Sequence, residues 1–465
     1  MLTDKKNIHF EVSERKILLR IFDVILICFS FFIINQLFGF SYFELDSNHV
    51  IENLVLFFYI TLFGTIFEMY DLQKSSRLET ILTSIMVTTS TTVLFYVLTP
   101  YYTPSLPDNR IQILYFFLTI FGTLLIWRYA YIKLISSPRF YKRVLLVGEM
   151  SNISSIYKTL QSADPNYVIV GYINCENSAN EVDSVNDILE FKPNQLIEVI
   201  KKEAISEVVI ATYNSETITS KLYEDLLLLL ESGFPIKEYT QAYEDMMFRV
   251  PVQFVGKDFY KYFPFSRNNQ NRLYLASRRF LDVLIAIVGL CFSVIFLPIV
   301  LIGNLLANRG PMLYTQLRVG KNAKPFKIYK LRSMIVNAEE HGAVWATKND
   351  KRVTKFGRFL RKSRLDELPQ FYNILKGDMS VIGPRPERPK FVKELSHNIP
   401  FYQTRHIVKP GLTGWAQVKS RYGSSLDDSL VKLQYDLYYI KHRSFLLDLN
   451  IIFKTLSTVV FYRGQ

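Results

Sequence analysis

Cysteine is scarce in this chain of 465 residues: Cys28, Cys175 and Cys291 are far apart and odd in number. Two of the three lie in apolar stretches, so the sequence predicts neither a framework of disulfide bonds nor a thiolate metal site. No short apolar segment followed by a small-residue cleavage site stands at the start, so we expect no removable signal peptide. These absences argue against the small disulfide-rich secreted proteins and against cysteine-based metal domains.

Acidic residues are also in the minority, 42 against 55 lysines and arginines, which gives a formal net charge of +13. That sign suits an anionic membrane face, substrates that carry phosphate, or nucleic acid. The basic residues form neither a long tail nor an isolated finger, and no nucleic-acid motif accompanies them. We therefore expect membrane lipids and phosphorylated compounds as partners, and no nucleic acid.

Hydrophobic residues, by contrast, are abundant, at 49% of the chain with 15% aromatic, so part of the chain is expected to meet lipid. Four long apolar stretches come first, each near the ~20 residues that a helix needs to cross a bilayer. They run at about 17–40, 51–70, 80–99 and 111–134. The sequence thus predicts a four-helix transmembrane region over residues 1–140.

The charges that flank these stretches predict their orientation. Basic residues precede the first stretch, separate the second from the third and follow the fourth, whereas the first connection on the other side carries Glu44 and Asp46. Lysine and arginine accumulate on the cytoplasmic side of membrane helices, so we expect both ends of the bundle in the cytoplasm. The basic residues are Lys5, Lys6, Arg15, Lys16, Lys74, Arg77, Arg139, Lys142 and Arg143.

Residues 141–268 show a different pattern, in which short β-rich apolar runs alternate with polar helical stretches. The runs RVLLVGE, YVIVGYIN, SEVVIAT and FPIKEY predict a doubly wound, Rossmann-like α/β domain. A dinucleotide site would need G-x-G-x-x-G after the first strand, but Gly148 is followed by Glu-Met-Ser-Asn-Ile-Ser. We therefore predict a spacer or regulatory domain without a catalytic role.

A fifth apolar run, over 281–307, is long enough to span the membrane, yet a full crossing would carry everything after it to the other side. Basic residues stand on both flanks, and Pro298 lies inside, where its missing N–H and its ring would kink a helix. These features predict a re-entrant helix that breaks at Pro298 and returns to the cytoplasmic side. The alternative is an ordinary fifth span with a proline kink.

Two adjacent carboxylates, Asp366 and Glu367, lie in the most basic part of the chain. Apolar residues follow them at a helical spacing that ends at Gly377, so the pair is expected in or just before a first helical turn. The unpaired N–H groups there favour negative charge and nearby phosphate. The neighbouring cations are expected to lower the carboxyl pKa more than the two acids raise it. The alternative is that Ser363 and Asp366 form only a helix-capping box.

Basic side chains on neighbouring motifs are the candidates for binding phosphate. Arg385 lies in the turn GPRP at 383–386, and an arginine fork can bind pyrophosphate through two hydrogen bonds. Donors of this kind stabilise the charge that develops on phosphoryl oxygens. The predicted phosphate-binding residues are Arg361, Arg385, Arg388, Lys330 and Arg332.

Several motifs together resemble one family, the long-form monotopic phosphoglycosyl transferases, which are polyprenyl-phosphate hexose-1-phosphate transferases. The motifs are RRFLD at 278–282, YKLRSM, RLDELPQ, KGDMSVIGPRPERP, KPGLTGWAQV and YDLYYIK. The resemblance implies an α+β monotopic sugar transferase domain over 272–465, with the re-entrant helix at its start. It also implies a bacterial inner-membrane protein whose catalytic domain faces the cytoplasm, and a possible homodimer.

The same resemblance implies the chemistry. A UDP-sugar would donate a sugar 1-phosphate to undecaprenyl phosphate, releasing UMP in the first membrane step of exopolysaccharide, capsule or O-antigen synthesis. Asp366 would attack the β-phosphorus to form an aspartyl-phosphosugar, and Glu367 would hold Mg²⁺. A carboxylate nucleophile is chemically sensible, because a lipid phosphate is already anionic and needs no base.

Two alternatives remain open. A membrane-anchored nucleotide-sugar dehydratase shares the four spans and a Rossmann domain, but the Y-x-x-x-K spacing of Tyr129 and Lys133 falls at the end of the fourth span. A non-catalytic scaffold for polysaccharide assembly fits if the acid pair is only a cap. No motif indicates which sugar is transferred.

Overall fold

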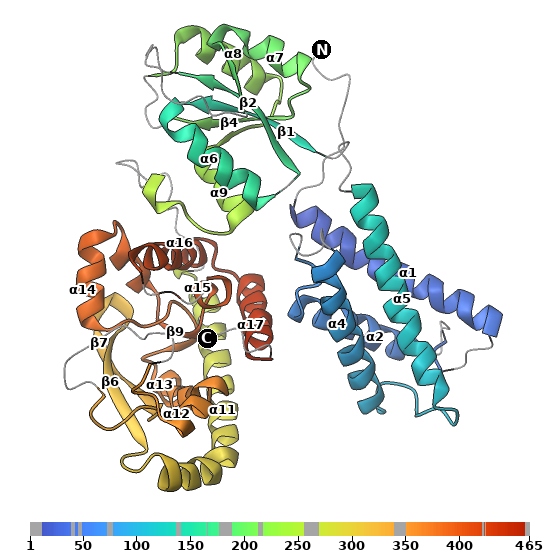
Figure 1. Cartoon of the computed structure of the whole chain (residues 1–465), viewed down its shortest axis with the longest axis vertical. Coiled ribbons are helices and arrows are strands. Elements are labelled where there is room, and N and C mark those ends of the chain that lie inside the picture. The colour runs from blue at the N-terminus through green and yellow to red at the C-terminus, as the bar shows by residue number, and fades with distance from the viewer. Residues whose placement is uncertain are drawn as a thin grey trace. The chain divides into compact units, whose positions relative to one another are not determined.

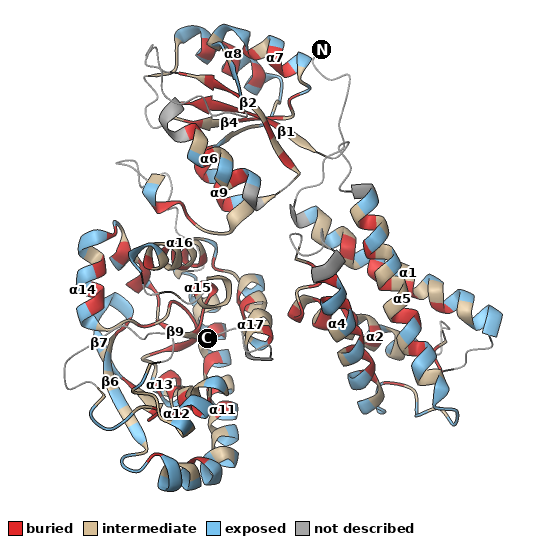
Figure 2. Ribbon diagram, viewed as in Figure 1, coloured by how far each residue is buried: buried red, intermediate tan, exposed pale blue. Residues whose placement is uncertain are grey.

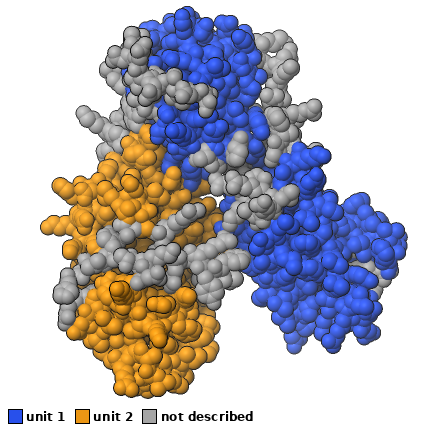
Figure 3. All heavy atoms as spheres, viewed as in Figure 1, with its two compact units in different colours: residues 1–247 blue, residues 248–465 orange. Residues whose placement is uncertain are grey.

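The computed structural model describes residues 12–38, 42–44, 49–71, 78–135, 141–164, 166–175, 188–212, 217–254, 269–338, 350–420, 423 and 425–460. The chain forms two compact units, residues 1–247 and 248–465 (Figure 3). Each unit has its own buried apolar clusters. Of the basic residues used to predict orientation, Lys5, Lys6, Lys74, Arg77 and Arg139 lie outside the described residues.

The first unit begins with the predicted apolar helices α1 (Val12–Phe38), α2 (Val50–Ile66), α4 (Leu78–Leu98) and α5 (Ile111–Ile135). Helix α1 packs on α5, α5 on α4, and α4 on α2 (Figure 1). In the described residues, four helices are long and apolar enough to cross a membrane: α1, α4, α5 and α11 (Arg272–Ala307). Helix α2, with 17 residues, is shorter and stands at the lower end of spanning lengths. These helices make the chain a membrane protein.

A buried ion pair joins the first and last helices of this bundle. Both guanidinium Nη atoms of Arg128 on α5 donate to the carboxylate of Asp23 on α1, each at 2.8 Å. Both side chains are fully buried, with 0% of their surface exposed. Removing one partner of such a pair leaves a buried charge uncompensated, so the pair fixes how α1 packs against α5.

The parallel sheet of the predicted α/β domain follows in the same unit, and it has five strands. Its strands are β1 (Lys142–Gly148), β2 (Tyr167–Asn174), β3 (Leu189–Phe191), β4 (Glu207–Ala211) and β5 (Ile236–Glu238). Their order in the sheet is β3-β2-β1-β4-β5, the arrangement of a Rossmann-like domain. The helices are α6 (Met150–Ala163), α7 (Leu196–Lys202), α8 (Ser220–Glu231) and α9 (Tyr239–Met247). Helices α6 and α9 pack together on one face, and α7 and α8 on the other (Figure 1).

The glycine at the end of β1 has a packing reason. A Cβ atom at Gly148 would come within 2.6 Å of the carbonyl oxygen of Ala211 on β4. A glycine is therefore required for the close approach of two strand ends, whether or not a phosphate binds there.

The second unit has α+β architecture. Two short sheets, the antiparallel pair β6 (Leu313–Val319) with β7 (Pro325–Leu331) and the parallel pair β8 (Ser380–Ile382) with β9 (Gly411–Thr413), lie among helices. After α11 the helices are α12 (Lys355–Lys362), α13 (Gln370–Lys376), α14 (Pro389–Asn398), α15 (Trp415–Lys419), α16 (Leu426–His442) and α17 (Phe445–Val460). The short 3-10 helices η8 (Leu365–Glu367) and η9 (Tyr402–Ile407) complete the parts that build the site.

Helix α11 is anchored near its start by charged side chains. The guanidinium of Arg278 donates to the Ser380 hydroxyl at 3.1 Å and to the Ile382 carbonyl, both on β8. The carboxylate of Asp282 accepts from the same hydroxyl at 3.0 Å and from the backbone N–H of Val381 at 2.8 Å. The RRFLD motif therefore ties the apolar helix to the sheet of the second unit.

The middle and end of α11 also contact other helices of the second unit. The ring of Phe371 on α13 packs on Gly289, where a Cβ would come within 2.5 Å of it. The ring of Phe356 on α12 packs on Gly303 in the same way. Elsewhere along α11, exposed residues recur (Figure 2), and many of them are large and apolar. The helix thus has one side docked on the rest of the second unit and one side suited to lipid.

The predicted break at Pro298 does not interrupt the helix, because Arg272–Ala307 is continuous with the proline inside. One proline removes a single backbone hydrogen bond and bends a helix without ending it. In Figure 1 the last part of α11 turns aside from the rest.

Candidate active site

The acid pair lies in a tight turn between two helices. Helix α12 ends at Lys362, Arg364 adopts the left-handed conformation at φ 59°, and the turn η8 then carries Asp366 and Glu367. The hydroxyl of Ser363 donates back to the carbonyls of α12, at 2.9 Å to Phe359. No side chain caps η8, so the interpretation of Ser363 and Asp366 as a capping box is wrong.

The helix that follows the pair is the predicted one. Helix α13 begins after Pro369 and ends at Gly377, whose φ of 93° is the left-handed conformation that glycine favours at a helix end. The buried amide of Asn373 ties α13 to strand β7: it accepts from the Tyr329 N–H at 3.1 Å and donates to the Lys327 carbonyl at 2.7 Å. This link brings the basic strand β7 beside the acids.

Glu367 is held by two of the predicted cations. Its Oε1 accepts from Lys330 Nζ at 3.1 Å and from Arg385 Nη2 at 3.2 Å. Burial acts to raise the pKa of Glu367, but the charges of Lys330, Arg385 and Arg364 outweigh it, so the pKa lies well below its usual range. Glu367 is therefore a stable anion.

Asp366 behaves differently, with only 8% of its surface exposed. Burial, together with the charge of Glu367, raises the pKa of Asp366 to about 6, against the opposing charges of Lys330, Arg361 and Arg364. The expectation that the cations lower both pKa values is thus wrong for Asp366, because burial disfavours its charged form. Two neighbouring acids whose environments separate their pKa values are a common sign of separate chemical roles.

The structure brings most of the predicted cations to the pair. The guanidinium of Arg361 donates its Nε–H to the Ser333 hydroxyl at 2.9 Å and acts electrostatically on Asp366. Arg364, a neighbour in the sequence that was not among the predicted ligands, acts on both acids. Arg388 precedes α14, and its guanidinium lies 5.8 Å above the ring of Phe391.

Arg332 is the predicted phosphate ligand that the structure places elsewhere. Its guanidinium donates to the carbonyls of Pro311, at 2.5 Å, and Asn308. The amide of Asn308 donates in return to the Arg332 carbonyl at 2.7 Å. Arg332 thus holds the chain that leaves the C-terminal end of α11, and its role in binding phosphate stays a prediction.

The site can supply few metal ligands by itself. Across the part of the chain that the structure describes, no group of three or more His, Cys, Asp or Glu side chains gathers. Both hydrogen bonds to Glu367 fall on Oε1, which leaves Oε2 as the oxygen that can face a cation. A magnesium ion keeps several waters and is often bound through one or two carboxylates plus substrate phosphates. The acid pair fits that kind of site.

The second unit combines a buried acid pair, surrounded by lysine and arginine side chains, with a helix suited to lipid. This combination indicates the class of membrane proteins that bind phosphate compounds. Residues 273–462 match the bacterial sugar transferase family, and residues 65–217 match the family described as a CoA-binding domain. The chain belongs to the bacterial sugar transferase family.

Named relatives are similar to part of this chain. A putative undecaprenyl-phosphate N-acetylgalactosaminyl 1-phosphate transferase from Bacillus subtilis (strain 168) is 50% identical over 141 residues, 30% of this chain and 79% of the relative. The UDP-N-acetylgalactosamine-undecaprenyl-phosphate N-acetylgalactosaminephosphotransferase of Aeromonas hydrophila is 48% identical over 189 residues, 40% of this chain and 44% of the relative. The UDP-glucose:undecaprenyl-phosphate glucose-1-phosphate transferase of Klebsiella pneumoniae is 40% identical over 187 residues, 40% of each chain. The chain therefore spans less than half the length of two of these three relatives.

Proposed function

We propose that this protein transfers a hexose 1-phosphate from a UDP-sugar to undecaprenyl phosphate, which gives undecaprenyl-diphosphate-sugar and UMP. The observation that carries the proposal is the acid pair Asp366 and Glu367, whose pKa values are moved apart within a cluster of cations. The names of the Aeromonas and Klebsiella relatives support the donor and the acceptor. The proposal includes the place of this step at the start of exopolysaccharide, capsule or O-antigen synthesis, and a homodimer.

In this proposal Asp366 is the nucleophile. Its carboxylate attacks the β-phosphorus of the donor, the bond from that phosphorus to the bridging oxygen breaks, and UMP leaves with the electron pair. An oxygen of the lipid phosphate then attacks the same phosphorus and releases the carboxylate of Asp366. A pKa of about 6 leaves Asp366 mostly ionised at neutral pH, while its burial keeps water away from the intermediate.

The cations have a separate role. Lys330 and Arg385, which hold Glu367 in the resting site, and Arg361, which acts on Asp366, would neutralise charge that develops on the phosphoryl oxygens. Magnesium, when bound through Glu367, would supply further neutralisation of the donor phosphates.

The alternative enzyme, a membrane-anchored nucleotide-sugar dehydratase, is not favoured. Tyr129 and Lys133 lie on α5, within the apolar bundle, and the only glycine at the end of β1 is explained by close strand packing. The scaffold alternative depended on a capping role for the acid pair, which Ser363 does not support. The proposed transferase function therefore accounts best for the buried acid pair and the cations around it.

The covalent intermediate gives a direct test. When the purified protein is incubated with UDP-sugar, labelled in the sugar, and without lipid, we expect up to one equivalent of UMP and a labelled peptide that contains Asp366. UMP release that depends strictly on added undecaprenyl phosphate would instead indicate direct displacement and contradict the covalent role of Asp366. Boiled protein serves as the control for spontaneous hydrolysis.

We further propose that α11 is re-entrant and that the second unit lies on the cytoplasmic side of the bacterial inner membrane. The support is that Arg278 and Asp282 near one end of α11, and Asn308 just beyond the other, all contact the rest of the second unit. A straight crossing would place those two ends on opposite faces of the bilayer, about 30 Å apart. Because α11 contacts the rest of one unit along its length, we infer that it enters one leaflet of the bilayer and does not cross to the other side.

A labelling experiment tests this topology. In a background with the native cysteines replaced by serine, Lys321→Cys introduces a thiol at an exposed position after β6. Tyr101→Cys is the matched control, because residue 101 is 95% exposed and lies between α4 and α5. A membrane-impermeant maleimide added to spheroplasts should label only the residue 101 variant. Equal labelling of both variants from outside would contradict the re-entrant arrangement.

A further inference from the structure

The loop that carries Arg385 is held almost entirely through its carbonyl groups. Pro384 and Pro386 have no N–H, so this loop cannot build an ordinary ladder of backbone hydrogen bonds. Instead, four consecutive backbone carbonyls accept hydrogen bonds from donors outside the loop. Two donors are backbone N–H groups: Gly411 donates to Pro384 at 2.9 Å, and Val319 donates to Glu387 at 2.9 Å. The other two are side chains: Arg405 donates to the Arg385 carbonyl at 3.0 Å, and Arg318 donates to the Pro386 carbonyl at 3.0 Å. Two of the four donors are arginine side chains.

Arg405, on η9, is one of these two arginines and has three hydrogen-bond acceptors. Its Nη1 donates to the Tyr402 hydroxyl at 2.7 Å, and its Nη2 donates to the Asp436 carboxylate at 2.7 Å and to the Arg385 carbonyl at 3.0 Å. Arg405 is 5% exposed and Asp436 1% exposed. A rigid guanidinium fork shared by three acceptors has little freedom to move, so it fixes the carbonyl that it holds.

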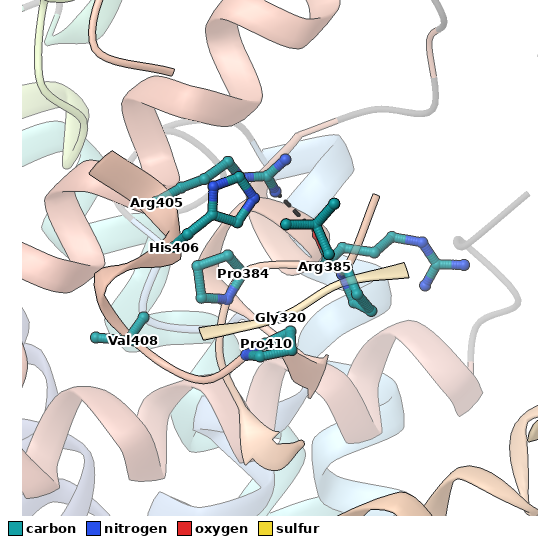
Figure 4. Close-up of a pocket in the computed structure, with 9 residues that line it drawn as sticks. Gly320, Pro384, Arg385, Arg405, His406, Val408 and Pro410 are labelled. Carbon is teal, nitrogen blue, oxygen red and sulfur yellow. Dashed lines mark hydrogen bonds between the residues drawn. The ribbon is translucent and has the colours of Figure 1, made fainter. Parts of the chain in front are cut away.

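The geometry separates the two ends of Arg385. Figure 4 shows the hydrogen bond from Arg405 to the backbone of Arg385, and it shows the guanidinium of Arg385 directed away from Arg405. That side chain is 34% exposed and contacts Glu367 at 3.2 Å. The backbone is thus fixed by buried groups, while the side chain extends toward the acid pair.

We propose that Arg405, held by Asp436, is a positioning residue that acts through Arg385. By fixing the Arg385 carbonyl, it sets where the Arg385 guanidinium meets Glu367 and the phosphates of the donor. This inference rests on the proposed function, because it assigns Arg405 a role in that reaction. Misplacement of a catalytic group by about 1 Å can cost ~100-fold in rate, so a positioning residue has a measurable effect.

A double-mutant cycle tests the proposal. Arg405→Lys keeps the positive charge opposite Asp436 but cannot serve all three acceptors, so kcat/KM should fall about 10- to 100-fold. Arg385→Ala should lower it about 100- to 1,000-fold, the range found when one donor to a developing charge is removed. If Arg405 acts through Arg385, the double variant should lie within about threefold of Arg385→Ala alone.

The matched control is Arg443→Lys, which makes the same change at another buried arginine, 7% exposed, whose Nη1 donates to Asn269 at 3.2 Å. It should keep wild-type kcat/KM. Should Arg405→Lys not fold, Asp436→Asn removes the carboxylate that holds Arg405 and completes the same cycle. Losses that multiply in the double variant would overturn the positioning role while leaving the transferase function intact. A wild-type protein that releases no UMP with any UDP-sugar would overturn the function and this inference together.

Discussion

Replacing Asp366 by asparagine should reduce UMP release by at least ~10⁴-fold, because removing a covalent nucleophile eliminates the step that breaks the donor bond. Glu367→Gln should behave differently. It keeps the side-chain shape but removes the charge held by Lys330 and Arg385, so its main effect should be a higher magnesium concentration for half-maximal rate. Both effects are measured as UMP formed from UDP-sugar at several magnesium concentrations.

The control for Asp366→Asn is Asp427→Asn, which removes a carboxylate from an exposed position in the first turn of α16. That variant should retain wild-type turnover. Removing a nucleophile leaves far less than about a hundredth of the wild-type activity. An Asp366→Asn protein with more activity than that would contradict the role of Asp366 as the nucleophile. Deamidation to aspartate can restore activity over time, so fresh protein and mass spectrometry of the Asp366 peptide belong to the measurement.

Asp282→Ala should destabilise the second unit by about 2–6 kcal/mol, because each of two buried donors that loses its acceptor costs ~1–3 kcal/mol. Asp282 is 6% exposed, and without its carboxylate the Val381 N–H and the Ser380 hydroxyl lose their acceptor, while Arg278 loses a neighbouring negative charge. The measurement is urea unfolding in detergent micelles, followed by the fluorescence of the chain's tryptophans.

Asp282→Asn is the matched comparison, because its amide oxygen can still accept from Val381. It should lose less stability than the alanine variant, although it too removes the negative charge near Arg278. If both variants unfolded at the wild-type urea concentration, the contact between α11 and β8 would contribute little to stability, and the anchoring role of Asp282 would be wrong.

The acid pair was predictable because its signals are local. A helical spacing that ends at Gly377 predicted Asp366 and Glu367 in or just before a first helical turn, and the structure places them in η8, just before α13. The separation of their pKa values was not predictable, since it depends on burial by residues from other parts of the chain. Sequence proximity to cations alone predicted the same direction for both acids.

Lys330 and Arg332 illustrate a second limit of predicting the site from the sequence. Both residues stand in the basic motif YKLRSM, so both were predicted to bind phosphate. Strand β7 ends at Leu331, however, and Arg332 turns to the end of α11 while Lys330 reaches Glu367. Where a strand ends is among the least certain features of a sequence, and here it separates a site residue from a structural one.

The positioning pair Arg405 and Asp436 shows why other site residues were missed. They are 31 residues apart in the chain, and Asp436 stands in an aromatic-rich helical run that resembles an ordinary core or interface helix. No periodicity connects them, because their contact is created by the packing of η9 on α16. The sheet of the first unit was mostly predictable from its apolar runs, but strand β3 lies outside these runs.

The Asp23–Arg128 pair constrains how the protein is made. The two residues are 105 positions apart, so at a synthesis rate of about 5–20 residues per second α1 emerges roughly 5–20 s before its partner. A lone aspartate costs about 2.5–3.5 kcal/mol at the centre of a helix entering the membrane. Helix α1 must therefore be retained near the insertion machinery, or at the membrane surface, until α5 has been synthesised. Assembly of this bundle is thus ordered in time by one pair of charges.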